Sequence, residues 1–194
     1  MGVVGTVWSE TALPLAPLPP SGEWTVDDLD ALPDDGLRRE LVDGVVLVSP
    51  APRPAHQAVV TALLRVLAPA CPPELTVLAG PVGVRQGRSR ELQPDLVVVE
   101  TARLAEPVLT APPRLVVEVA SRSTRLVDRA LKREVYADRG VPSYWLVGVE
   151  EPGVVVLELA GDGRYAEVAR GGAGDAVEVT RPFPVRVEPG RLVP

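Results

Sequence analysis

The chain has 194 residues and a formal net charge of −6, and aromatic residues make up only 4% of it, so valine, leucine and alanine must build its core. This length fits one domain with a buried core. The lone Cys71 excludes an internal disulfide, and Glu10 interrupts the first apolar run. We therefore expect a cytoplasmic protein with no signal peptide and no membrane contact.

Charge is distributed unevenly along the chain. Residues 1–37 carry seven acids and no lysine or arginine, whereas the remainder has 20 basic and 19 acidic groups. Residues 85–139 are mildly basic, with 11 basic and 8 acidic groups. This distribution permits contacts with nucleic-acid phosphates without requiring them.

The predicted elements follow a proline-rich leader, residues 1–22, which we expect to be flexible, and residues 23–194 are expected to form one domain. A short helix over 25–32 begins with a capping box of Thr25 and Asp28. A hairpin over 38–49 turns at Asp43-Gly44, which suits a type I′ turn. The helix that follows spans 55–68.

Strand-like segments then cover 75–79 and 82–86, with a turn over 87–91. Residues 95–100 and 115–120 are almost continuously apolar, which is typical of central strands buried on both faces. A helix over 125–140 ends at a glycine, a strand covers 143–150, and the rest suggests a β meander. The pattern predicts an α/β fold with a central sheet between helices.

Two carboxylates interrupt the buried strands. Glu118 lies inside "LVVEVA", and Asp95 opens "DLVVVE" directly after Pro94. If the strands are neighbours, both carboxylates can reach one divalent cation such as Mg²⁺. The alternatives are that Glu118 faces solvent or pairs with an arginine, and that Asp95 only begins its strand.

Lys132 is the one lysine beside 19 arginines, in a chain that has no isoleucine and no asparagine. This usage indicates a GC-rich genome that replaces lysine by arginine wherever charge alone is needed. Lys132 therefore marks a position where arginine does not serve, or it is a surface residue kept by chance. On a helical wheel it lies beside Asp128 and Tyr136, from where it could point at the strand of Glu118 or pair with Asp128.

The ordered segments "ELVDG", "QPDLVVVE", "LVVEVASRST", "DRALKREVY" and "GVPSYWLV" resemble the Uma-two family of restriction-endonuclease-like proteins, in the PD-(D/E)xK nuclease superfamily. The resemblance runs from about residue 24 to 168. It implies a restriction-endonuclease-like mixed sheet flanked by helices. It also implies that Asp95, Glu118 and the Val119 carbonyl bind Mg²⁺, for which Mn²⁺ could substitute.

The same resemblance implies roles for further residues. Glu40 would be a third acidic position, although it could instead pair with Arg38 or Arg39 in the hairpin. Ala120 stands where a lysine would complete the ExK signature, so the lysine role would pass to Lys132. From the residues themselves, Arg122 and Arg125 could contact phosphates, as could His56 at the start of its helix, while Ser123 or Thr124 could cap the helix that follows. For His56 alone, a structural or surface role is the favoured interpretation.

The function implied is a metal-dependent endonuclease that hydrolyses DNA phosphodiester bonds, and it would act as a homodimer if both strands are cut. Two alternatives stay open. The chain could be a nuclease-like module without turnover that binds DNA or a protein, which Ala120 and the acidic balance favour. It could also use Asp95 and Glu118 as an acid–base pair on a sugar, which the scarcity of aromatic residues disfavours.

Overall fold

The structure is a computed structural model that describes residues 19, 22–120 and 128–193. Its helices are α1 (Val26–Asp30), α2 (Pro54–Ala70) and α4 (Arg133–Asp138), with a π-helical segment η2 (Asp128–Lys132) directly before α4. Its strands are β1 (Arg38–Val42), β2 (Val45–Ser49), β3 (Leu75–Ala79), β4 (Val84–Gln86), β5 (Arg90–Leu92), β6 (Leu96–Glu100), β7 (Leu115–Ala120), β8 (Ser143–Gly148), β9 (Gly153–Leu159), β10 (Tyr165–Gly172), β11 (Val177–Val179) and β12 (Val185–Val187).

Two local predictions at the start of the described chain are confirmed. The Thr25 side chain accepts a hydrogen bond from the Asp28 N–H, and the Asp28 carboxylate accepts one from the Thr25 N–H. Both turn residues of the β1–β2 hairpin have positive φ, 48° at Asp43 and 79° at Gly44, as a type I′ turn requires. Capping and turn chemistry therefore fix this part of the chain locally.

The six-stranded sheet at the centre has the order β10-β9-β8-β7-β6-β3. It is a mixed sheet because β7 and β8 are parallel while the other neighbours are antiparallel. All six residues of β7 and the first four of β6 are buried, which confirms the prediction of central strands covered on both faces. The two carboxylate-bearing segments are therefore adjacent in the sheet.

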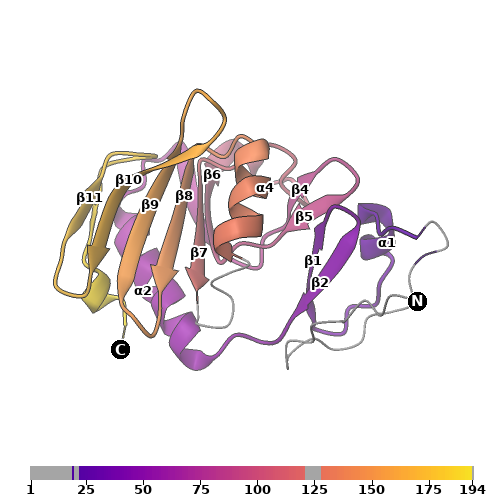
Figure 1. The fold of residues 1–194 in the computed structure, drawn as a ribbon, viewed down its shortest axis with the longest axis horizontal. Helices are drawn as coiled ribbons and strands as arrows, with labels where there is room; N and C mark the ends of the chain where they lie inside the picture. The colour runs from indigo at the N-terminus through magenta and orange to yellow at the C-terminus, as the bar shows by residue number, and fades with distance from the viewer. Residues whose placement is uncertain (1–18, 20–21, 121–127, 194) are drawn as a thin grey trace, which may run out of the picture.

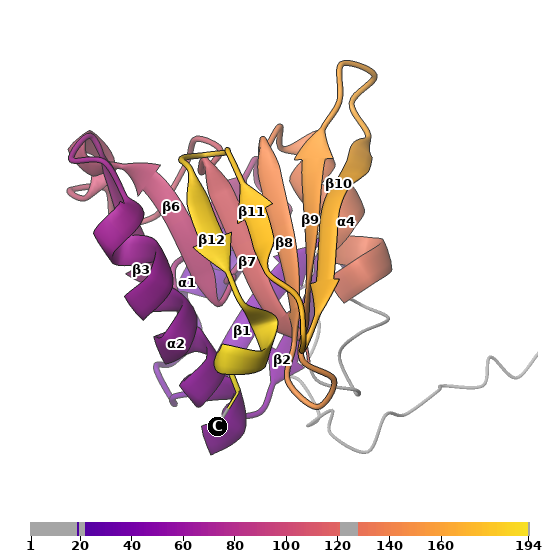
Figure 2. The same cartoon turned by 90° about the vertical axis from the view of Figure 1, so that its left-hand side faces the viewer.

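Helices cover both faces of this sheet, as the sequence predicts. Helix α2 and the β11–β12 hairpin lie on one face and α4 lies on the other (Figures 1 and 2). The α2 face packs residues such as Leu63, Leu96 and Val117, and the α4 face packs Val97, Val116 and Tyr136. Strands β8, β9 and β10 form a meander, whereas the last stretch forms the separate β11–β12 sheet.

A four-stranded sheet of order β2-β1-β5-β4 stands beside the central sheet and carries the hairpin with Glu40 (Figure 1). Trp24 and Val26 pack against Leu41 and Val46 in a small core of their own. Among the described residues, no helix is long and apolar enough to cross a membrane.

The helix expected over 125–140 differs from the prediction. Residues 128–132 form a π-helical turn, and α-helix begins only at Arg133. A wheel of 100° per residue does not apply through a π turn, because its hydrogen bonds run from i to i+5 rather than i+4. The expected caps Ser123 and Thr124 lie outside the described residues.

Candidate active site

The β6–β7 register brings Asp95 and Glu118 together. Leu96 pairs with Val117 in this antiparallel ladder, so one further step places Asp95 opposite Glu118. Directly opposed residues of antiparallel strands point to the same face of a sheet. Both carboxylates therefore lie on the α4 side of two buried neighbouring strands, where Asp95 is 8% and Glu118 is 2% exposed.

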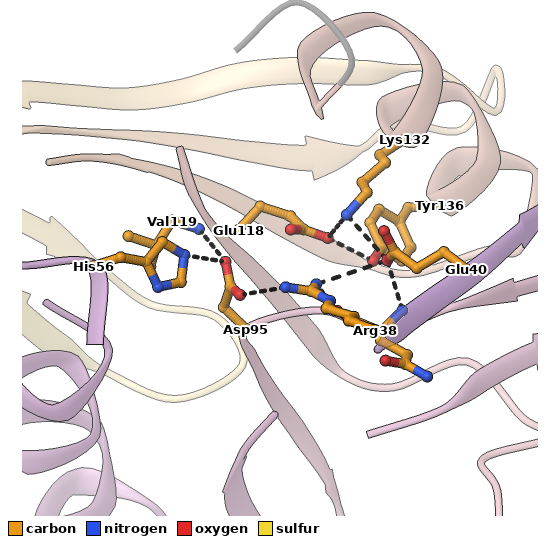
Figure 3. Close-up of polar contacts among 9 residues, drawn as sticks. Arg38, Glu40, His56, Asp95, Glu118, Val119, Lys132 and Tyr136 are labelled. Atoms are coloured by element: carbon orange, nitrogen blue, oxygen red, sulfur yellow. Dashed lines mark hydrogen bonds and ion pairs between the residues drawn. The ribbon is translucent and has the colours of Figure 1, made fainter. Parts of the chain in front are cut away.

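Glu118 is held by two donors from the helical segment that covers it. The Lys132 Nζ lies 3.1 Å and the Tyr136 hydroxyl 2.8 Å from Glu118 Oε1 (Figure 3). Burial and the negative charges of Glu118 and Glu40 hold the pKa of Tyr136 well above its ordinary value, so its hydroxyl keeps its proton and donates. Glu118 therefore does not face solvent, and among the described residues Lys132 is a cation paired with it.

Lys132 joins Glu118 to the hairpin of the second sheet. The Lys132 Nζ lies 3.1 Å from Glu40 Oε1, while the nearer hairpin arginine, Arg38, is 3.7 Å from the same oxygen. Glu40 Oε1 also accepts the Gln93 N–H at 2.8 Å. A single ammonium group thus bridges carboxylates that come from both sheets.

Lys132 reaches Glu118 from a different element than the strand that carries Ala120. Ala120 ends β7 and is buried, so a side chain there would lie two residues beyond Glu118 on the same face. The lysine instead enters from the junction of η2 and α4. Single π turns within helices often occur at functional sites, because they redirect side chains that a regular helix would place elsewhere. The predicted partner Asp128 has a side chain outside the described part of the structure.

Asp95 is bonded through both of its carboxylate oxygens. Its Oδ1 lies 3.2 Å from Arg38 Nη1, and its Oδ2 accepts the Val119 N–H at 2.8 Å and lies 3.2 Å from His56 Nε2. Burial alone raises the pKa of Asp95, but the hydrogen bond from His56, the charge of Arg38 and the Val119 N–H together lower it below its usual value. Asp95 is therefore ionised at neutral pH.

The structure brings together most of the residues that the sequence nominates. Glu40, Asp95, Glu118 and Lys132 form one buried cluster, and the Val119 amide contacts Asp95. His56 also lies at the site, although a structural or surface role is the favoured sequence interpretation; its imidazole contacts Asp95 from the first turn of α2. Arg122 and Arg125 lie outside the described residues.

The sequence analysis assigns no site role to three residues of the cluster, although it names Arg38 as a possible partner of Glu40, and the two do pair. Arg38 contacts Asp95 across 57 positions of sequence, Tyr136 contacts Glu118, and the Gln93 backbone contacts both Glu40 and Arg38. The wheel places Tyr136 beside Lys132 and so gives a signal for it. No local signal predicts that Arg38 contacts Asp95 or that the Gln93 backbone contacts Glu40, because only the packing of β1 beside the start of β6 brings these groups together.

The donor set fits Mg²⁺. Among the residues that the structure describes, no three histidine, cysteine, aspartate or glutamate side chains are grouped so as to hold an ion by themselves. Mg²⁺ needs no such cage, because it binds through one or two carboxylates and completes its octahedron with waters and substrate phosphates. Two opposed carboxylates with hard oxygen donors meet that requirement.

Comparisons with known proteins identify the family and the fold of the chain. The chain matches the Uma2 family model, described as "Putative restriction endonuclease", over residues 26–191. Its fold is similar to that in the crystal structure of a "putative nuclease belonging to DUF820" from Anabaena variabilis, with a TM-score of 0.70 and 16% identity over 87% of this chain and 96% of that chain. At this identity the likeness establishes the fold alone. No curated protein matches the chain. Because the family match covers most of its length, this restriction-endonuclease-like α/β protein belongs to the Uma2 (Uma-two) family.

Proposed function

We propose that this protein is an endonuclease that hydrolyses DNA phosphodiester bonds with Mg²⁺, for which Mn²⁺ could substitute. One observation carries the proposal. The family signature expects a lysine where Ala120 stands, and the buried Lys132 lies 3.1 Å from Glu118 instead. Burying a lysine and three carboxylates costs desolvation free energy, and apolar residues in their place would often be at least as stable. Such a cluster therefore points to a role beyond stability. Family membership and the nuclease-like fold support the same reading.

The charge balance of the cluster supports one metal ion and one phosphodiester group. Three carboxylates, Glu40, Asp95 and Glu118, stand against two cations, Lys132 and Arg38, which leaves one negative charge if His56 is neutral. One divalent ion would reverse this excess. One phosphodiester anion would then restore neutrality, so the site is electrostatically suited to that pair of ligands.

Asp95, Glu118 and the Val119 carbonyl are the groups that would hold the ion. When bound, Mg²⁺ lowers the pKa of a water molecule and stabilises the negative charge that develops on phosphorus oxygens. The hydrogen bonds of Asp95 with His56 and with the Val119 N–H fix one carboxylate. The bond from Tyr136 fixes the other. Both are thereby held in orientation before substrate arrives.

Lys132 would orient the attacking water and neutralise charge beside the scissile phosphate. Its ammonium is aimed by two acceptors, Glu40 Oε1 and Glu118 Oε1, which hold it beside the carboxylate that would bind the ion. Glu40 acts here as a positioning residue, because it holds Lys132 and is itself held by the Gln93 N–H. In this assignment Glu40 supports the lysine rather than the metal.

Cleavage of supercoiled plasmid in Mg²⁺ tests the proposal. We expect Asp95→Asn and Glu118→Gln to lower the rate by about 10²–10³ or more, the usual cost of losing one positioned electrostatic group. Glu91→Gln is the matched control, since Glu91 is also a buried carboxylate in an ion pair, with Arg85, outside the cluster. Wild-type cleavage by either site variant would exclude this assignment.

A nuclease-like module without turnover is the second candidate, and one observation favours it. Both oxygens of Asp95 already have protein partners, including the positive charge of Arg38. A site closed in this way could bind DNA or a protein without binding metal. In that case wild-type protein would leave plasmid intact in both Mg²⁺ and Mn²⁺, and Asp95→Asn would bind DNA as well as wild type does.

A further inference from the structure

Arg38 lies among the three carboxylates of the site and has no assigned role in the proposed chemistry. Its Nη1 is 3.2 Å from Asp95 Oδ1, its Nη2 is 3.7 Å from Glu40 Oε1, and Nη2 also donates to the Gln93 carbonyl (Figure 3). The guanidinium group therefore occupies space beside the carboxylate that would bind the metal.

Arg38 is held less completely than the other cation of the cluster. The Lys132 side chain is 5% exposed, whereas that of Arg38 is 23% exposed and so keeps a route to solvent. The Arg38 Nε is buried without a hydrogen-bond partner among the described residues. A purely structural ion pair normally satisfies its buried donors. The described contacts of Arg38 therefore leave one of its buried donors unsatisfied.

The partners of Asp95 show which contact has to change when a cation arrives. Oδ2 lies 3.2 Å from His56 Nε2 and accepts the Val119 N–H, which belongs to the backbone of β7 and cannot leave without disrupting the strand. Oδ1 is bonded by Arg38, a long side chain that enters from β1. Oδ1 is therefore the oxygen that can exchange a protein partner for a metal ion.

We propose that Arg38 is a built-in counter-ion of the metal site, which bonds Asp95 in the free protein and is displaced from Oδ1 when the divalent ion binds. The inference rests on the proposed function, since it assumes that Asp95 is a metal ligand. In the free protein the guanidinium stabilises a cluster that would otherwise carry two excess negative charges. Its presence lowers the metal affinity in return, because ion and arginine compete for the same oxygen.

Binding of Mn²⁺ without DNA tests this, by titration calorimetry or by the electron paramagnetic resonance signal of free Mn²⁺. We expect Arg38→Gln to bind Mn²⁺ about tenfold or more tightly than wild type, because one competing positive charge is gone. Mn²⁺ should also raise the melting temperature of this variant more than that of wild type. Arg39→Gln is the matched control: Arg39 is the next residue of β1, pairs with Asp35 and contacts none of the site residues, so its affinity should equal wild type.

Arg38→Lys keeps the positive charge and serves if Arg38→Gln does not fold. A single ammonium cannot reproduce the planar fork that spans Asp95 and the Gln93 carbonyl, so its Mn²⁺ affinity should lie above that of wild type and below that of Arg38→Gln. Wild-type or weaker affinity in the variants that fold would overturn the role of Arg38. If wild type binds Mn²⁺ and Asp95→Asn does not, the metal site stands even when Arg38 fails. If no variant binds Mn²⁺, both proposals are wrong.

Discussion

At the scale of single residues, the lone lysine of the chain is explained by its surroundings. Lys132 is 4% exposed, so it is not a surface lysine retained by chance. A compact ammonium with three N–H donors can donate to Glu40 and Glu118 at 3.1 Å each within this small enclosure. An arginine in the same enclosure would be longer, bulkier and restricted to the plane of its fork. The presence of lysine at position 132, in a chain that uses arginine at its 19 other basic positions, therefore has a steric and geometric reason.

Lys132 variants should separate charge from shape. We expect Lys132→Arg to cleave DNA far more slowly than wild type, since it keeps the charge but cannot occupy the site in the same way. Lys132→Ala should be nearly inactive and also less stable by about 3–5 kcal/mol, because two buried carboxylates lose their shared cation. Plasmid cleavage and urea unfolding measure the two effects.

The control for the stability effect is Arg88→Ala, which removes an exposed ion pair with Asp27 and should change the free energy of unfolding by less than about 1 kcal/mol. Wild-type cleavage by Lys132→Arg would show that any buried cation suffices at this position.

At the scale of helices and strands, local signals were sufficient for most of the fold. The capping box at Thr25, the turn at Asp43-Gly44 and the apolar runs of β6 and β7 each depend on neighbouring residues, and each is found where the sequence predicts it. The meeting of Asp95 and Glu118 follows from the adjacency of those two runs.

Contacts between distant elements could not be predicted in this way. Arg38 reaches Asp95 only because β1 belongs to a second sheet that packs beside the first, and His56 does so because α2 begins next to the end of β7. The π turn before α4 likewise has no periodic signature, so the wheel could place Lys132 only at the edge of a stripe.

The support behind Asp95 gives a prediction at this scale. Gly80 follows β3 and donates its N–H to the Asp95 carbonyl at 2.8 Å, and a Cβ on Gly80 would lie 2.3 Å from the Pro94 carbonyl oxygen. Gly80→Ala must therefore displace the backbone that carries Asp95. We expect weaker Mn²⁺ binding and slower plasmid cleavage, measured on protein that remains folded by circular dichroism.

Gly161→Ala is the matched control for this prediction, because a Cβ there would meet no atom within 4 Å and the glycine has no positive φ. Unchanged Mn²⁺ affinity in Gly80→Ala would mean that the Asp95 carboxylate does not depend on the backbone contact behind it.

At the scale of the whole molecule, the fold redistributes the charges that the sequence separates. The acidic start of the described chain pairs with arginines far along it, Asp27 with Arg88 and Asp30 with Arg85. Arg90, Arg103 and Arg114 are also in ion pairs with carboxylates. Five arginines of residues 85–139 are therefore paired with carboxylates in the described structure, which the linear charge count could not show.

The pairing of these arginines leads to a prediction about how DNA would bind. With a net charge of −6 and most described arginines of the basic segment already paired, the protein has little positive surface to attract a polyanion. We expect duplex DNA to bind weakly in EDTA and on the order of tenfold more tightly in Ca²⁺, because a divalent ion at Asp95 and Glu118 would supply the missing positive charge. Fluorescence anisotropy of a labelled duplex, with ionic strength held constant by NaCl, measures both affinities.

Asp95→Asn should remove the Ca²⁺ effect, since it lacks one of the two carboxylates that bind the ion. Equal affinities of the wild-type protein in EDTA and in Ca²⁺ would mean that phosphate recognition lies elsewhere, on charges that do not depend on the metal site.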